Sequence, residues 1–140
     1  MKLEESDVIA VDLDGTLADD TVISMVDYRP DLIGKPIPLL VKRVKAWLAE
    51  GKKIVIFTAR VHPRHGLADV AMVEKAIKEW CMNVFGVEFE VTCMKDPLFV
   101  QIWDDKVIRV LKNRGILSSQ SDVDDPIVQE ESDQIGKFLS

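Results

Sequence analysis

Four short apolar runs are spread along the chain, and each has the composition of a buried β-strand. They are rich in β-branched and aromatic side chains, which fit a pleated and buried surface, and they cover residues 8–11, 53–57, 88–93 and 98–103. Val8, Ile9 and Val11 make the first run almost continuously apolar. Such a run is typical of a strand that is covered on both faces of a parallel sheet.

Three longer segments carry apolar residues at a spacing of three or four, which predicts amphipathic helices. The predicted helices cover residues 38–50, 66–84 and 105–113. Their inward-facing residues are Ile37, Val41, Val44 and Leu48 in the first, Val70, Val73, Ile77, Trp80 and Val84 in the second, and Val107, Val110 and Leu111 in the third. Prolines at the start of the first helix and a glycine after each of the first two support these boundaries.

The alternation of strands and helices predicts an α/β fold. We expect a Rossmann-like, three-layer α/β/α domain over residues 1–117, built on a small parallel sheet with helices on both faces. Residues 118–126 are rich in Ser and Asp, as is typical of a boundary. Residues 118–140 are therefore expected to form an acidic C-terminal tail, either disordered or docked as a short helix.

Composition and charge exclude several classes of protein. The chain has 140 residues, of which 47% are hydrophobic, and this is enough for one domain with a core. No run of about 18 apolar residues is present, which argues against a membrane protein, and the charged N-terminus lacks a secretory signal. Cys81 and Cys93 lack the spacing of a zinc site or disulfide scaffold. We therefore expect a reduced, cytoplasmic protein.

The negative charge is concentrated in the tail. The formal net charge is −6, and residues 122–140 contribute −5 of it, because they hold six acidic residues and one lysine. The rest of the chain is nearly neutral. An acidic chain disfavours extended nucleic-acid binding, which needs many basic contacts to phosphates, but it leaves a small phosphorylated ligand possible.

Two carboxylates directly follow the first predicted strand. Asp12 and Asp14 flank one residue and precede Gly15 and Thr16, at the point where an extended chain breaks. Carboxylates this close repel each other, and a divalent cation or a phosphoryl group in need of a nucleophile would relieve that repulsion. The alternative is an acidic turn, because Asp and Gly are common turn residues.

Later segments also place polar side chains at or near strand ends. Thr58 follows the second apolar run, Asp104 and Asp105 follow the last one, and Lys95 precedes the last one. Open α/β sheets bind their ligands at the carboxyl ends of the strands. We therefore expect these side chains to meet Asp12 at one edge of the sheet.

The motif DLDGT, the run KIVIFTAR, the isolated Lys95 and the segment IWDD, in this order, resemble the four motifs of the haloacid dehalogenase-like (HAD) superfamily. The match spans about residues 7–112, and the chain is most similar to short phage- and bacteria-type hydrolases. The resemblance implies transfer of a phosphoryl group to water with Mg²⁺. Cap domains of this superfamily follow the first or second motif, but the gaps here are too short for a folded domain of about 40 residues. We therefore expect no sizeable cap, and an open site with residues 19–35 as a partial lid.

The resemblance also implies roles for individual residues. Asp12 is expected to be the nucleophile that forms an aspartyl-phosphate, and Asp14 the general acid and then the general base. Thr58 is expected to donate to a phosphate oxygen, and Lys95 to neutralise charge on the transferring group.

Two further sets of residues are expected at the site. The residues expected to hold Mg²⁺ are Asp12, Asp14 through its backbone carbonyl, Asp104 as a direct ligand and Asp105 as a helper. Asp105 is alternatively the cap of the following helix. The residues expected to bind substrate are Gly15, Thr16, Ala59 and Arg60. For Arg60 the alternative is a solvated basic loop that also contains His62, Arg64 and His65.

Several functions stay open at this level. A small phosphorylated substrate is the leading expectation. A polynucleotide 3′-end phosphatase is an alternative, because the TAR motif and the short form resemble the phosphatase half of polynucleotide kinase–phosphatases. A signalling receiver module has its acidic pair on the first strand and a single Asp as phosphoacceptor on a middle strand. This chain instead has Asp12 and Asp14 after the first strand and Asp104 and Asp105 after the last one, so a receiver module is disfavoured. A non-catalytic interaction module that recruits partners through the acidic tail is a further alternative. The sequence predicts neither the substrate's identity nor the oligomeric state.

Overall fold

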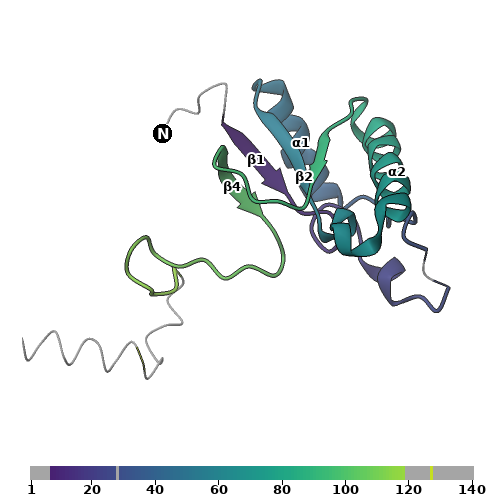
Figure 1. Cartoon of the computed structure of the whole chain (residues 1–140). Coiled ribbons are helices and arrows are strands. Elements are labelled where there is room, and N and C mark those ends of the chain that lie inside the picture. Colours follow the sequence, from purple (N-terminus) through teal and green to yellow (C-terminus); the bar gives the residue numbers. More distant parts are fainter. Residues whose placement is uncertain (1–6, 28, 119–126, 128–140) are drawn as a thin grey trace, which may run out of the picture. The chain divides into compact units, whose positions relative to one another are not determined.

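The structure is a computed structural model that describes residues 7–27, 29–118 and 127. The chain divides into two units, Met1–Asp105 and Lys106–Ser140, and each is described by itself below (Figure 1). The division falls after Asp105, before the boundary that the sequence predicts at residue 117. The described helices and strands all belong to the first unit, apart from the helical residue Ile127.

The first unit is built on a parallel sheet with the strand order β3-β2-β1-β4. The four strands are β1 (Val8–Val11), β2 (Lys53–Phe57), β3 (Glu90–Thr92) and β4 (Phe99–Trp103). All four predicted strands are present, and the sheet is entirely parallel. β1 lies in the interior of the sheet, and all four of its residues are buried, which explains its continuous apolar sequence.

Two α-helices connect the first three strands, and both begin and end close to the predicted residues. They are α1 (Pro38–Ala49) and α2 (Leu67–Phe85). Gly86 ends α2 in the left-handed conformation, with φ of 77°, and its N–H donates to the carbonyl oxygen of Met82, as a C-terminal glycine commonly does. Three short 3₁₀ helices also occur, η1 (Thr21–Ser24), η2 (Ala59–Val61) and η3 (Pro63–His65).

The main core lies between the helices and one face of the sheet. Alternate residues of β1 and β2 meet buried residues of the helices there; the set includes Ile9, Val11, Ile54, Ile56, Val44, Val73, Ile77 and Cys81. The helices α1 and α2 also contact each other. Since β1, β2 and β3 are adjacent in chain order, two right-handed crossovers place both helices on the same face.

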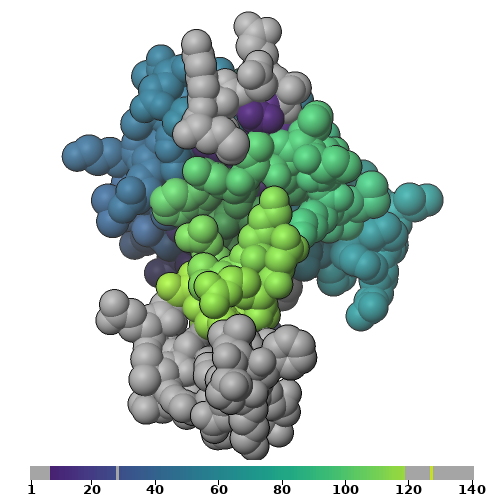
Figure 2. Space-filling view, turned by 90° about the vertical axis from the view of Figure 1, so that its left-hand side faces the viewer, coloured from purple at the N-terminus to yellow at the C-terminus, as the bar shows by residue number. Residues whose placement is uncertain are grey.

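The other face of the sheet is crossed by the connection from β3 to β4. Met94 and Leu98 of this connection line a cavity of about 160 Å³ together with Val8 and Val55, and Phe57 contacts Phe99 edge-to-face. In Figure 2 the green segment that contains this connection and β4 lies in front, and little of the purple N-terminal strand is visible. The α/β fold with a parallel sheet and no sizeable cap is therefore confirmed, but the described residues form no helical layer on this second face.

The helix predicted over residues 105–113 is wrong. The chain turns back on itself there, because the N–H of Leu111 donates to the carbonyl oxygen of Ile116 (2.6 Å) and Val110 pairs with Leu117 in an antiparallel bridge. Asn113 and Gly115 adopt left-handed conformations, with φ of 63° and 67°, which a helix cannot contain. Val110 is 55% exposed, so this segment lacks the buried apolar face that would favour a helix. Apart from Ile127, the predicted tail beyond Ser118 lies outside the described residues.

None of the described helices has both the length and the apolar composition needed to cross a bilayer.

Candidate active site

The register of the sheet places Asp12 beside Asp104. Val11, the last residue of β1, pairs with Trp103, the last residue of β4. The N–H of Asp12 then donates to the carbonyl oxygen of Trp103 (2.8 Å), which extends this pairing by one residue. The two acids therefore leave neighbouring strands at the same carboxyl edge, as the sequence predicts.

Asp12, Asp104 and Asp105 form the acidic cluster of the site. Each offers a carboxylate oxygen, and these oxygens all lie within 4.8 Å of one another. Asp12 and Asp104 are partly buried and Asp105 is exposed. Three carboxylates at this distance repel one another, so the cluster favours either a bound proton or a bound cation. Three of the four predicted ligands are thus brought together by their side chains.

Burial, together with the neighbouring carboxylates, raises the pKa of Asp12 to about 7 from its usual value of 3.8. Burial is the largest cause, since it disfavours the charged form, and the negative charge of Asp104 is the next. The hydrogen bond from Thr16 opposes this, while the contact and charge of Asp105 add to it. Near neutral pH, without a cation, Asp12 therefore exists as both acid and carboxylate.

Thr16 connects the two acidic segments, a role that differs from the predicted contact with substrate. Its hydroxyl lies 3.1 Å from Oδ2 of Asp12 and 3.4 Å from Oδ1 of Asp105, and its single proton can serve only one of them at a time. The same oxygen accepts the backbone N–H of Asp105 (3.0 Å). Thr16 is buried, so it joins the loop after β1 to the end of β4.

Gly15 is required by its surroundings as well as by its backbone. It adopts a left-handed conformation with φ of 84°, and a Cβ atom placed there would lie 2.7 Å from Oδ2 of Asp105. Only glycine permits both the conformation and the close approach of Asp105. Its predicted contact with substrate is not tested by these contacts.

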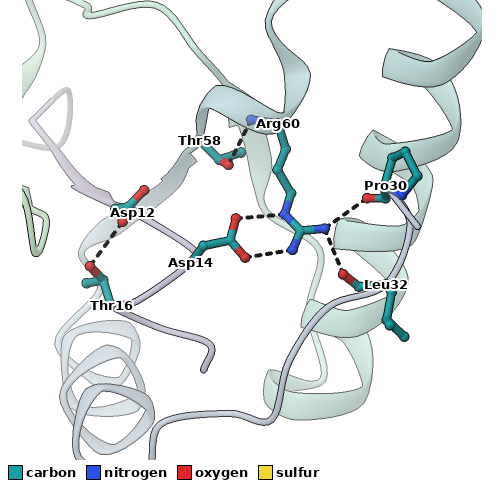
Figure 3. A network of polar contacts seen from close by, with 7 residues as sticks. All are labelled: Asp12, Asp14, Thr16, Pro30, Leu32, Thr58 and Arg60. Atoms are coloured by element: carbon teal, nitrogen blue, oxygen red, sulfur yellow. Dashed lines mark hydrogen bonds and ion pairs between the residues drawn. The ribbon is translucent and has the colours of Figure 1, made fainter. Parts of the chain in front are cut away.

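Asp14 points to Arg60 and does not belong to the acidic cluster. Nε and Nη2 of Arg60 donate to its two carboxylate oxygens, each at 2.7 Å. Figure 3 shows that this carboxylate faces the guanidinium group, whereas Asp12 faces Thr16. The predicted metal contact of Asp14 through its backbone carbonyl is a separate matter and stays a prediction.

Arg60 is buried, so the alternative of a solvated basic loop does not hold for this residue, while its predicted contact with substrate stays a prediction. Only 8% of the residue is exposed. Its Nη1 donates to the carbonyl oxygens of Pro30 (2.8 Å) and Leu32 (2.7 Å) (Figure 3). Arg60 therefore binds the protein's own groups along two edges of the guanidinium group. The sequence contains the arginine, but not the long-range geometry that gives it these partners.

Thr58 lies at the end of β2, as predicted, but it is only 3% exposed. Its N–H donates to the carbonyl oxygen of Thr92 (2.9 Å). Its hydroxyl oxygen accepts the N–H of Arg60 (3.2 Å) and so caps η2, which begins at Ala59. The hydroxyl proton stays available for the predicted phosphate contact. The predicted contact of Ala59 with substrate is not tested.

Lys95 lies in the connection between β3 and β4, and its predicted place beside Asp12 stays a prediction. It is exposed in the connection between β3 and β4 and lines the cavity on the second face of the sheet, with Lys53 and Glu90 among the neighbouring residues. It is absent from the groups that shift the pKa of Asp12. The predicted electrostatic role of Lys95 therefore finds no contact here that supports it.

The basic loop after Arg60 contains His62, Arg64 and His65. Nδ1 of His62 accepts the N–H of Arg64 (3.0 Å), and His65 lines a cavity of about 100 Å³ with Pro30, Arg60 and two residues of α2. Across residues 7–27 and 29–118, the group of possible ligands contains carboxylates alone.

No family model matches the sequence, and no curated protein matches it either. Among solved structures, the chain is similar to a conserved protein from Bacteroides thetaiotaomicron, with 29% sequence identity and a TM-score of 0.40. The match covers 64% of this chain and 60% of that one. The residues of the site therefore carry the functional proposal that follows.

Proposed function

We propose that the protein is a Mg²⁺-dependent phosphatase that hydrolyses a phosphomonoester through an aspartyl-phosphate on Asp12. The observation that carries the proposal is the acidic cluster at the adjoining carboxyl ends of β1 and β4, with Asp14 two residues beyond Asp12. A receiver-type module would need its phosphoacceptor on another strand. An interaction module would not need carboxylates held in mutual repulsion.

The donor set of the acidic cluster fits a hard divalent cation. Mg²⁺ prefers oxygen ligands and is usually bound by one or two carboxylates together with water and substrate phosphate. Asp12, Asp104 and Asp105 supply such oxygens at neighbouring strand ends, and Asp105 is exposed to solvent. When bound, the cation would neutralise charge on the carboxylates and on the transferring phosphoryl group.

The reaction would then proceed in two steps, in which Asp12 and Asp14 take part. In the first, a carboxylate oxygen of Asp12 forms a bond to phosphorus, the bond from phosphorus to the substrate oxygen breaks, and Asp14 gives that oxygen a proton. In the second, Asp14 takes a proton from water while the water oxygen bonds to phosphorus. The bond from phosphorus to Asp12 breaks, which releases inorganic phosphate and restores both carboxyl groups.

The proposal is tested by turnover of p-nitrophenyl phosphate with Mg²⁺ and with EDTA. Asp12→Asn should reduce turnover by at least about 1,000-fold while circular dichroism stays unchanged. Glu79→Gln is the control, because Glu79 is an exposed acidic residue of α2 and lies outside the acidic cluster; its turnover should equal that of wild type. Equal activity of Asp12→Asn and wild type, or undiminished activity in EDTA, would contradict the proposal. A 3′-phosphorylated oligonucleotide and a small alkyl phosphate extend the assay to the two substrate classes.

A further inference from the structure

Arg60 joins three segments that are distant in sequence. Its backbone N–H binds Thr58 at the end of β2, its Nε and Nη2 bind Asp14 after β1, and its Nη1 binds the carbonyl oxygens at residues 30 and 32. The side chain is 6% exposed, and that of Asp14 is 15% exposed. A bidentate pair with this little exposure fixes both the position and the plane of the carboxylate.

The planar guanidinium group is essential to this arrangement. It presents donors on two sides of a rigid fork, so one side holds Asp14 while the other holds the backbone of residues 30–32. A lysine would keep the positive charge, but its single ammonium group cannot hold the carboxylate in a fixed plane and also reach both carbonyl oxygens. The geometry of Asp14 therefore depends on an arginine, and not merely on a cation, at position 60.

We infer that Arg60 is a positioning residue for Asp14, and that it links the proton-transferring carboxylate to the backbone of residues 30 and 32. The inference rests on the proposed function, because it concerns the residue that protonates the leaving group. Both oxygens of Asp14 accept N–H groups of Arg60, so the direction from which Asp14 meets a leaving oxygen is set by Arg60. Arg60 acts on the reaction through Asp14.

Turnover of two substrates whose leaving groups differ in basicity can distinguish a role of Arg60 in positioning Asp14 from a merely structural role. An alkyl phosphate needs its leaving oxygen to be protonated, whereas p-nitrophenolate leaves without much help. A misplaced Asp14 therefore slows the alkyl substrate selectively. A generally loosened protein slows both substrates alike.

The experiment measures kcat and KM of Arg60→Lys for an alkyl phosphate and for p-nitrophenyl phosphate. We expect kcat for the alkyl phosphate to fall by about 100-fold and kcat for the aryl phosphate by less than about 10-fold, with KM nearly unchanged for both. Arg64→Lys is the matched control, because Arg64 is an exposed arginine of the same loop; both of its kcat values should equal those of wild type.

Equal losses on the two substrates would overturn the inference and leave the proposed function intact. If wild type turns over neither substrate, or if Asp12→Asn stays active, the proposed function fails and the inference fails with it. Should Arg60→Lys not fold, Asp14→Glu is the second test, because it keeps Arg60 and the charge but displaces the carboxylate by one methylene. The same selective loss is expected there, and an unselective loss would overturn the inference.

Discussion

At Gly15 both the backbone conformation and the nearby acidic cluster disfavour a Cβ atom. Gly15→Ala would place a methyl group 2.7 Å from Oδ2 of Asp105, in addition to straining a backbone with φ of 84°. Gly51→Ala is a matched control, because Gly51 has φ of 80° and no atom within 4 Å of its added Cβ. Both variants should lose about 1 kcal/mol from backbone strain, and Gly15→Ala should in addition displace the carboxylate of Asp105, which is the end of an exposed side chain.

Urea unfolding and Mg²⁺ titration of the two glycine variants measure this difference. Gly15→Ala should also bind Mg²⁺ more weakly, because Asp105 has to move, whereas Gly51→Ala should bind it as wild type does. Equal losses of stability with unchanged Mg²⁺ affinity in both variants would show that Asp105 does not approach Gly15 closely.

Asp12 makes the stability of the protein depend on pH and on Mg²⁺. Its pKa is raised from 3.8 to about 7, so between these values the folded state holds a proton that the unfolded chain has lost. The contribution of Asp12 to the free energy of unfolding is therefore complete below about pH 4 and is lost as pH rises through about 7. A cation competes with that proton, so it should bind more tightly as Asp12 ionises.

The stabilisation by Mg²⁺ should consequently be larger at about pH 8 than at about pH 5.5. Thermal unfolding with and without Mg²⁺ at the two pH values measures it. In Asp12→Asn the group that titrates is absent, so the difference between the two pH values should shrink. A rise in Tm with Mg²⁺ that is the same at both pH values in wild type would contradict the assignment of this proton to Asp12.

The helix α2 shows how far apolar periodicity predicts a buried face. Ile77 is completely buried and Leu67 is 91% exposed, and the sequence pattern places only Ile77 on the inward stripe. Ile77→Ala should reduce the free energy of unfolding by about 2–5 kcal/mol. Leu67→Ala should change it by no more than about 0.5 kcal/mol. Chemical denaturation of both variants checks this, and similar losses would mean that the helix packs by another face.

The spacing of apolar residues predicts a helix or strand correctly where its apolar side packs against a neighbouring helix or strand. The helices α1 and α2 and all four strands follow the pattern because each packs against another part of the core. The segment 105–113 has the same helical spacing, but Val107 and Val110 are each more than half exposed. The turn residues Asn113 and Gly115 decide its local structure instead, and their left-handed tendency is the signal in the sequence that indicates a turn.

The parallel sheet is what turns separate sequence motifs into one site. The side chains of Asp12 and Asp104 are 92 positions apart, and they meet because β1 and β4 are neighbours with their last residues paired. Strand ends are predictable from sequence, so the acidic cluster is too. The contacts of Asp14, Thr16 and Arg60 are not, because they depend on how loops from different strands pack after the sheet has formed.

The central claim for the whole molecule is that Asp12 carries the phosphoryl group during turnover. The most direct measurement is to quench the protein in acid while it turns over p-nitrophenyl phosphate with Mg²⁺, reduce it with borohydride, and map the modified peptide by mass spectrometry. An acyl phosphate is reduced to the alcohol, so we expect homoserine at position 12, with no such product after EDTA treatment. Turnover without modification of Asp12, or with modification at another carboxylate, would contradict the account.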